Sequence, residues 1–79
     1  MEELKSLVEF MACNLVENPG DVRVEAQQRG RVVSIQLMVP ADEMGKVIGR
    51  QGRVARAMRT LLTIAASRHA LRASLDIND

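Results

Sequence analysis

The chain of 79 residues is poor in aromatic side chains and in cysteine. It has no Trp, no Tyr and one Phe, so the aromatic platforms that stack nucleobases in many single-strand binders are missing. The single Cys excludes an internal disulfide and fits a reducing compartment. No apolar run approaches the roughly 18 residues of a membrane span, and the acidic start Met1-Glu2-Glu3 is unlike a signal peptide. We therefore expect a cytoplasmic protein with no membrane partner.

Residues that catalyse reactions or hold metals are also sparse. The one His, His69, falls at the end of the longest expected helix, and residues 45–75 contain no Asp or Glu. The glycines of that segment therefore have no neighbouring base or metal ligand. They do not match G-x-G-x-x-G, and Gly52 is not followed by the Lys-Ser/Thr of a phosphate-binding P-loop. We expect no catalytic residue, no metal and no cofactor.

Charge is distributed unevenly along the chain, although the net charge is only +1. Residues 1–44 hold four basic and eight acidic side chains, whereas residues 45–75 hold seven basic ones and no acid. A strongly positive segment in a nearly neutral protein indicates a localised site for a polyanion. The alternative for such a segment is a solvated, charged helix face.

Apolar residues recur at helical spacing in two long stretches. The spacing predicts one helix over Glu2–Glu17 and another over Arg53–His69, and Pro40 opens a short helix over Ala41–Val47. The expected core stripes are Leu4, Leu7, Val8, Met11 and Leu15 in the first helix, and Val54, Met58, Leu61, Leu62 and Ala65 in the last.

Alternating apolar and polar residues predict three strands, over 21–26, 31–39 and 71–77, with a turn at 27–30. The first two strands form an antiparallel hairpin, and the strands on either side of the two later helices lie parallel. The expected fold is α+β in the order α-β-β-α-α-β, a single domain over 1–79. Three helices cover one face of a three-stranded mixed sheet.

The stretch Gly49-Arg50-Gln51-Gly52, hereafter the GXXG loop, lies between two expected helices. A glycine lets the backbone approach a ligand closely, and a side chain at either glycine would hold a phosphate away. The following helix has no Ser, Thr, Asp or Asn cap, and Arg53 in its first turn opposes the helix dipole. A bound phosphate would supply the missing negative charge.

The segment Val47–Val54 resembles the Ile-Gly-x-x-Gly signature of KH domains, and the whole chain is similar to the small bacterial KH-domain RNA-binding proteins of the KhpA family. The resemblance implies a type II KH fold that binds single-stranded RNA, with the loop clamping about four nucleotides of backbone. It also implies a post-transcriptional regulator or RNA chaperone. The implied protein partners are a second copy of the chain or a larger, KhpB-like protein with a KH domain.

The expected RNA-binding residues are those of the loop and the basic or apolar positions beside it: Lys46, Ile48, Gly49, Arg50, Gln51, Gly52, Arg53 and Arg56. Arg59, Arg68 and Arg72 are expected to be solvated instead. Phosphate contacts alone leave single-stranded DNA open as a ligand. The competing hypothesis is a KH-fold module for protein interaction or dimerisation, with nucleic-acid binding secondary or lost.

Overall fold

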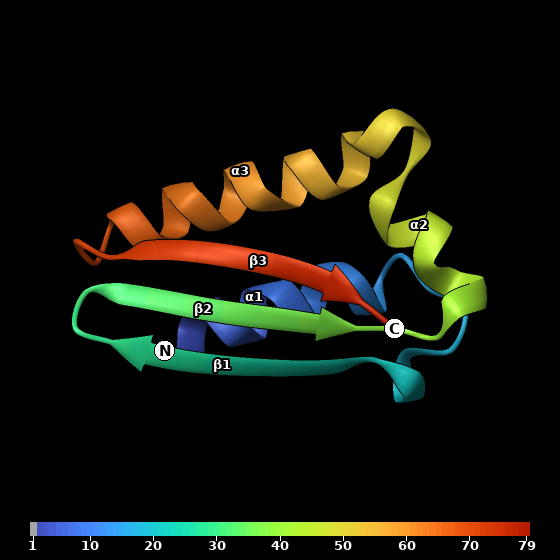
Figure 1. Ribbon diagram of the computed structural model, residues 1–79, viewed down its shortest axis with the longest axis horizontal. Coiled ribbons are helices and arrows are strands. Elements are labelled where there is room, and N and C mark those ends of the chain that lie inside the picture. Colours follow the sequence, from blue (N-terminus) through green and yellow to red (C-terminus); the bar gives the residue numbers. More distant parts are fainter. Residues whose placement is uncertain (1) are drawn as a thin grey trace.

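The computed structural model describes residues 2–79 and confirms the predicted order of elements (Figure 1). The helices and strands are α1 (Glu2–Cys13), β1 (Arg23–Arg29), β2 (Val32–Met38), α2 (Met44–Ile48), α3 (Arg53–Ser67) and β3 (Arg72–Asn78). Short 3-10 turns cover η1 (Pro19–Asp21), η2 (Ala41–Glu43) and η3 (Arg50–Gly52).

The three strands form one mixed sheet in the order β1-β2-β3, as predicted. Strand β1 is antiparallel to β2, with Arg29 opposite Val32, and β3 is parallel to β2, with Leu75 opposite Ile35. Because β2 is central, β1 and β3 are the two edges of the sheet. The hairpin turn between β1 and β2 lies at the opposite end of the molecule from α2 (Figure 1).

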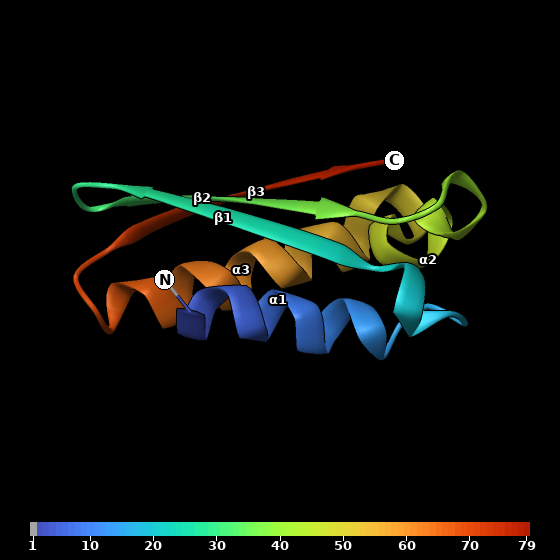
Figure 2. The same ribbon diagram turned by 90° about the horizontal axis from the view of Figure 1, so that it is seen from below.

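The helices lie on one side of the sheet, with α1 and α3 side by side and α2 at one end (Figure 2). Alternation along β2 accounts for this, since Ile35 is buried toward the helices while Ser34 and Gln36 are exposed. The helix-free face is polar, and Glu25, Gln27, Ser34 and Gln36 line a shallow hollow on it.

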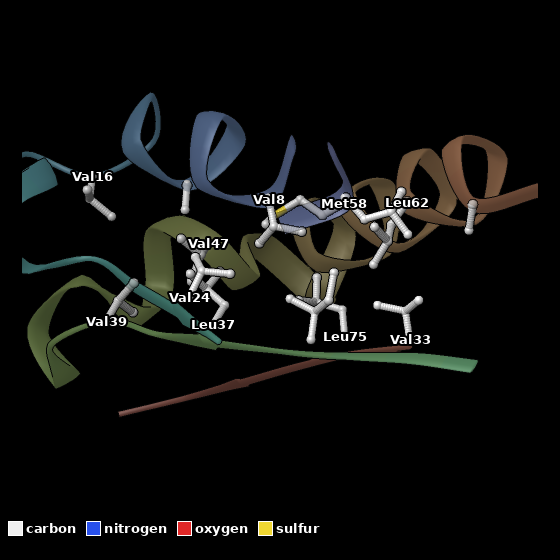
Figure 3. Close-up of a cluster of buried hydrophobic side chains, with 14 residues drawn as sticks. Val8, Val16, Val24, Val33, Leu37, Val39, Val47, Met58, Leu62 and Leu75 are labelled. Atoms are coloured by element: carbon white, nitrogen blue, oxygen red, sulfur yellow. The ribbon is translucent and has the colours of Figure 1, made fainter. Parts of the chain in front are cut away.

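The core lies between this sheet and the two long helices (Figure 3). Its side chains are Leu4, Val8, Ala12 and Val16 from the N-terminal part, Val24, Val33, Ile35, Leu37, Val39 and Leu75 from the sheet region, and Val47, Met58, Leu62 and Ala66 from the later helices. The core is thus built almost wholly from aliphatic groups and one Met.

The first helix is shorter than the predicted Glu2–Glu17 and ends at Cys13. Asn14 turns back on it, because its Nδ2 donates a hydrogen bond to the Phe10 carbonyl oxygen at 2.7 Å. The backbone N–H of Glu17 donates to the Glu43 carboxylate at 3.0 Å instead of continuing the helix. The predicted core position Leu15 is therefore exposed, and Val16 is buried in its place.

The hairpin also differs from the prediction of a strand over 21–26 and a turn at 27–30. Strand β1 continues to Arg29, and only Gly30 and Arg31 join it to β2. Gly30 has a φ of +59°, a conformation that glycine adopts without steric cost. A two-residue connection of this kind allows the ladder to run to its end.

Helix α3 buries Ala55, Met58, Leu62 and Ala66, a stripe rotated from the predicted one. The small side chains of Ala55 and Ala66 let the helix approach the sheet, and Leu61 is left 50% exposed. The helix ends at Ser67 rather than His69. The Leu71 N–H donates back to the Ala66 carbonyl at 3.0 Å, and Ala70 takes a left-handed φ of +57° that closes the helix.

Candidate functional site

The GXXG loop reverses the chain between α2 and α3 through three residues with positive φ. Gly49 has φ 76° and ψ 176°, Gln51 has φ 57°, and Gly52 has φ 75°. The side chains of Arg50 and Gln51 are both exposed at the tip. The backbone thus presents two polar side chains between two glycines, as the sequence predicts.

Gly49 is required by packing within the protein. A Cβ atom at this position would lie 2.9 Å from both the Cβ and the backbone N of Val54, closer than real side chains approach. Its pairing of positive φ with extended ψ is also essentially restricted to glycine. Gly49 therefore has a structural role in addition to the ligand approach expected of both glycines.

Gly52 faces open space. A Cβ built there meets no atom within 4 Å, so only its φ of +75° disfavours a side chain. Gly52 is also the N-cap of α3, which no side chain of residues 2–79 caps. The first N–H of the helix, that of Arg53, donates to the Arg50 carbonyl oxygen. The first turn contains Arg53 and no acid. The helix end is consequently electropositive and open on the side of the loop.

The arginines of the loop and the first turns of α3 are exposed. Arg56 Nη2 donates to the Gln51 carbonyl oxygen at 2.9 Å, which ties the helix to the tip of the loop. Throughout residues 2–79, no carboxylate lies within ion-pair distance of Arg50, Arg53 or Arg56. Their charge is therefore free to meet an external anion.

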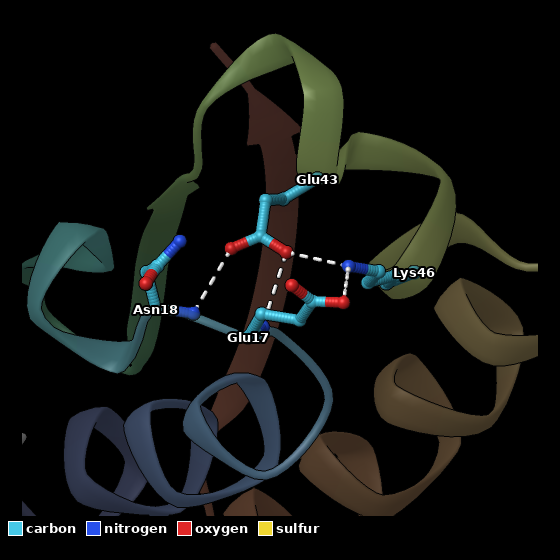
Figure 4. Close-up of polar contacts among 4 residues, drawn as sticks. All are labelled: Glu17, Asn18, Glu43 and Lys46. Carbon is cyan, nitrogen blue, oxygen red and sulfur yellow. Dashed lines mark hydrogen bonds and ion pairs between the residues drawn. The ribbon is translucent and has the colours of Figure 1, made fainter.

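Lys46 has internal partners (Figure 4). Its Nζ lies 2.9 Å from Glu43 Oε1 and 3.4 Å from Glu17 Oε1. Glu43 itself is 3% exposed and also accepts backbone N–H bonds from Glu17 at 3.0 Å and Asn18 at 3.2 Å. This cluster fastens the segment after α1 to the start of α2, so Lys46 is committed to structure more than the sequence suggests.

The same contacts shift two pKa values. The hydrogen bond from Lys46 and the backbone N–H of Glu17 hold the pKa of Glu43 below its ordinary value of 4.5, against the opposing effect of burial. The hydrogen bond to Glu43 in turn raises the pKa of Lys46. Both groups remain charged at neutral pH.

We expect Glu43 to make stability depend on pH on the acid side. Its pKa is lower in the folded than in the unfolded chain, so its contribution is full above about pH 4.5 and is lost as pH falls through the folded value. The difference in Tm between wild type and Glu43→Gln should therefore be large at pH 6 and shrink below pH 4, measured by circular dichroism. Glu25→Gln, on the open sheet face, is the control; an E43Q difference independent of pH would contradict the assignment.

The structure brings most of the predicted site residues together around one turn. Ile48 is half-buried against the core, and Val54 lies under Gly49. Two polar contacts could not be predicted from the sequence. Glu43 carried one local signal, an acid three residues before Lys46, but nothing local pointed to its partners 25 and 26 residues away. Arg59 is exposed, as predicted, and its Nε also donates to the Leu75 carbonyl oxygen at 3.1 Å.

Elsewhere in the described chain, His69 has a structural contact. Its Nε2 lies 3.1 Å from Glu3 Oε2 and links the end of α3 to the start of α1. Across residues 2–79 no group of three or more His, Cys, Asp or Glu side chains is placed to hold a metal ion. No helix in that range is both long and apolar enough to cross a membrane.

Solved structures with the same fold include the protein Era. The chain superposes on part of Aquifex aeolicus Era bound to GDP and AlF4− with a TM-score of 0.72 at 15% identity, over 95% of this chain and 30% of Era. It superposes on Era in complex with MgGDPNP and a segment of 16S ribosomal RNA with a TM-score of 0.62 at 18% identity, over 95% of this chain and 29% of that one. The likeness extends to one part of Era and concerns the fold.

Sequence comparison gives a closer relationship. An RNA-binding protein KhpA from Halalkalibacterium halodurans is 47% identical over 76 residues, which are 96% of this chain and 100% of that protein. Another from Aquifex aeolicus is 46% identical over 77 residues, 98% of each chain. The family described as KhpA/KhpB, KH domain, matches residues 5–77. Together with the α-β-β-α-α-β fold, these matches place the chain in the KhpA/KhpB family of KH domains.

Proposed function

We propose that the protein binds single-stranded RNA and holds the phosphate backbone on the GXXG loop. The proposal rests on a left-handed turn beside the N-terminus of α3, which no side chain of the described residues caps. The arginines next to this turn have no acidic partner within residues 2–79. The RNA-binding names of the similar proteins support it. As an RNA-binding protein of a bacterial family, it would act in the cytoplasm as a post-transcriptional regulator or RNA chaperone.

In this proposal the backbone of the strand passes over Gly52, where an added Cβ would meet no atom of residues 2–79 within 4 Å. The electropositive N-terminus of α3 and the guanidinium groups of Arg50 and Arg53 meet the phosphates, and Gln51 adds neutral hydrogen bonds. Ile48 offers aliphatic contact to a base. Without aromatic stacking, binding is modest in affinity and depends strongly on salt.

Fluorescence anisotropy of labelled single-stranded RNA pools across a salt series tests the proposal. A few neutralised phosphates at about 0.7 each predict a log–log slope of about −2 to −3. The same titration with single-stranded DNA compares the two ligands. Absence of RNA binding by the folded protein would overturn the proposal and favour a protein-interaction module.

We further propose that the protein acts as a homodimer, because one loop spans only about four nucleotides. Two sites on one assembly would raise the overall affinity through effective concentration. Helix α3 offers a surface for this contact, since Leu61 and Ile64 are 50% and 52% exposed and lie three residues apart on one helix. A larger KhpB-like protein could use the same surface.

Leu61→Glu should shift the protein from dimer to monomer without unfolding it, because Leu61 lies outside the core. Light scattering after size-exclusion chromatography measures the mass. Thr63→Glu, another exposed position on α3, should leave the mass unchanged. A wild-type protein that stays monomeric at high micromolar concentration would refute the dimer.

A further inference from the structure

Arg59 is fixed at the free edge of the sheet. Within residues 2–79, strand β3 pairs with β2 alone. The Arg72 N–H and the Asn78 carbonyl both point toward β2, because they bond to Arg31 and Val39 at its two ends. Successive residues of a strand direct their backbone N–H and C=O groups to alternate sides. Because Leu75 is an odd number of residues from both Arg72 and Asn78, its carbonyl points away from β2, toward the free edge. Its oxygen accepts the hydrogen bond from Arg59 Nε at 3.1 Å. A guanidinium group is thus held between α3 and the β3 edge.

This contact uses only part of the hydrogen-bonding capacity of Arg59. A guanidinium has five N–H donors, and the bond to Leu75 takes the one on Nε. Within residues 2–79, neither Nη atom of Arg59 has a hydrogen-bond or ion-pair partner. Although Arg59 is exposed, this one hydrogen bond orients the group and leaves its four Nη donors for a ligand.

The position of Arg59 suits a base better than a phosphate. It lies six residues along α3 from Arg53, about 9 Å from the helix end where the backbone phosphates are proposed to bind. Bases project away from that backbone. The Leu75 carbonyl oxygen beside the guanidinium also carries partial negative charge, which disfavours a phosphate at the same point.

We propose that Arg59 reads a nucleobase in the bound strand and selects guanine over adenine. The O6 and N7 atoms of guanine are neighbouring acceptors that match the two Nη groups of an arginine fork. Adenine presents an N6 donor beside N7, so one Nη group would face a donor and remain unpaired. This inference rests on the proposed RNA binding and adds a base preference to the same site.

The test compares oligouridine octamers that contain one central guanine or one central adenine, by anisotropy, for wild type, R59Q, R59K and R68Q. Wild type should bind the guanine octamer about five-fold or more tightly. The ratio should fall to near one in R59Q and R59K, since lysine keeps the charge but not the fork. It should persist in R68Q, an exposed arginine at the far end of α3. The ratio is insensitive to partial unfolding, which lowers both affinities equally.

The proposal would be overturned if wild type showed no guanine preference, or if R59Q kept the preference unchanged. It would also be overturned if R59Q weakened binding of both octamers equally and lowered the salt slope by about 0.7, because that change marks the loss of a phosphate contact. Failure of the proposed function is a separate result. It would appear as RNA binding that is absent, or that survives substitution of Arg50 and Gln51 by aspartate.

Discussion

The double variant Arg50→Asp/Gln51→Asp should lose RNA binding by at least about 100-fold, about 2.7 kcal/mol. The two changes turn the loop charge from +1 to −2 at the point where phosphates are proposed to lie, while both glycines stay. Loss of one charge-assisted hydrogen bond accounts for about 1.5–3 kcal/mol, and repulsion by two carboxylates adds to it. Anisotropy with labelled single-stranded RNA measures the change.

The fold should tolerate this variant. Both side chains are exposed, and Asp is among the residues that accept the left-handed φ of 57° found at Gln51. The matched control is Gln27→Asp/Arg29→Asp, which changes the same residue types and the same charge at the hairpin end of β1, far from the loop. Equal loss of binding in both variants would show that net charge, and not the loop, governs binding.

Gly49→Ala should lower the free energy of unfolding by at least about 3 kcal/mol, from strained φ/ψ and overpacking together. For a domain of this size, that loss corresponds to a fall in Tm of about 12 °C or more. The added Cβ would press on the backbone N and Cβ of Val54 in the first turn of α3, so the strain cannot be relieved by turning a flexible side chain. Thermal unfolding followed by circular dichroism gives the value.

Two other glycines separate the causes of this effect. Gly52→Ala has a similar positive φ but open space around the new Cβ, so it should cost about 1–2 kcal/mol. Gly20→Ala has neither strain nor a close neighbour and should change stability by less than about 0.5 kcal/mol. Equal effects at Gly49 and Gly52 would mean that contact with Val54 does not matter.

The order of elements and the mixed sheet could be predicted because periodicity is a local property of the chain. Residues 31–39 alternate, and the two helices between β2 and β3 leave room for a parallel return. Apolar spacing alone could not predict the end of α1, because Asn14 bonds back to Phe10 and Glu17 bonds to Glu43, 26 residues away. Apolar spacing alone likewise did not reveal that Ala55 and Ala66 face the core while Leu61 faces solvent.

The candidate site was predictable to the extent that glycine spacing and charge determine it. Glycine permits the positive φ found at Gly49 and Gly52, and the acid-free segment leaves Arg50 and Arg53 without an ion-pair partner among residues 2–79. The commitment of Lys46 to Glu17 and Glu43 depends on tertiary contacts. The same holds for the bond between Arg59 and Leu75, which forms only when α3 packs beside β3.

The helix-free face of the sheet provides a place for a spectroscopic label. Ser34 lines its shallow hollow and points away from the helices that carry the loop. A fluorophore on Ser34→Cys, with Cys13 replaced by Ser to leave one thiol, would report the tumbling of the protein itself. Unlabelled RNAs of any length and sequence could then be compared in one assay, without a dye on the nucleic acid competing for the site.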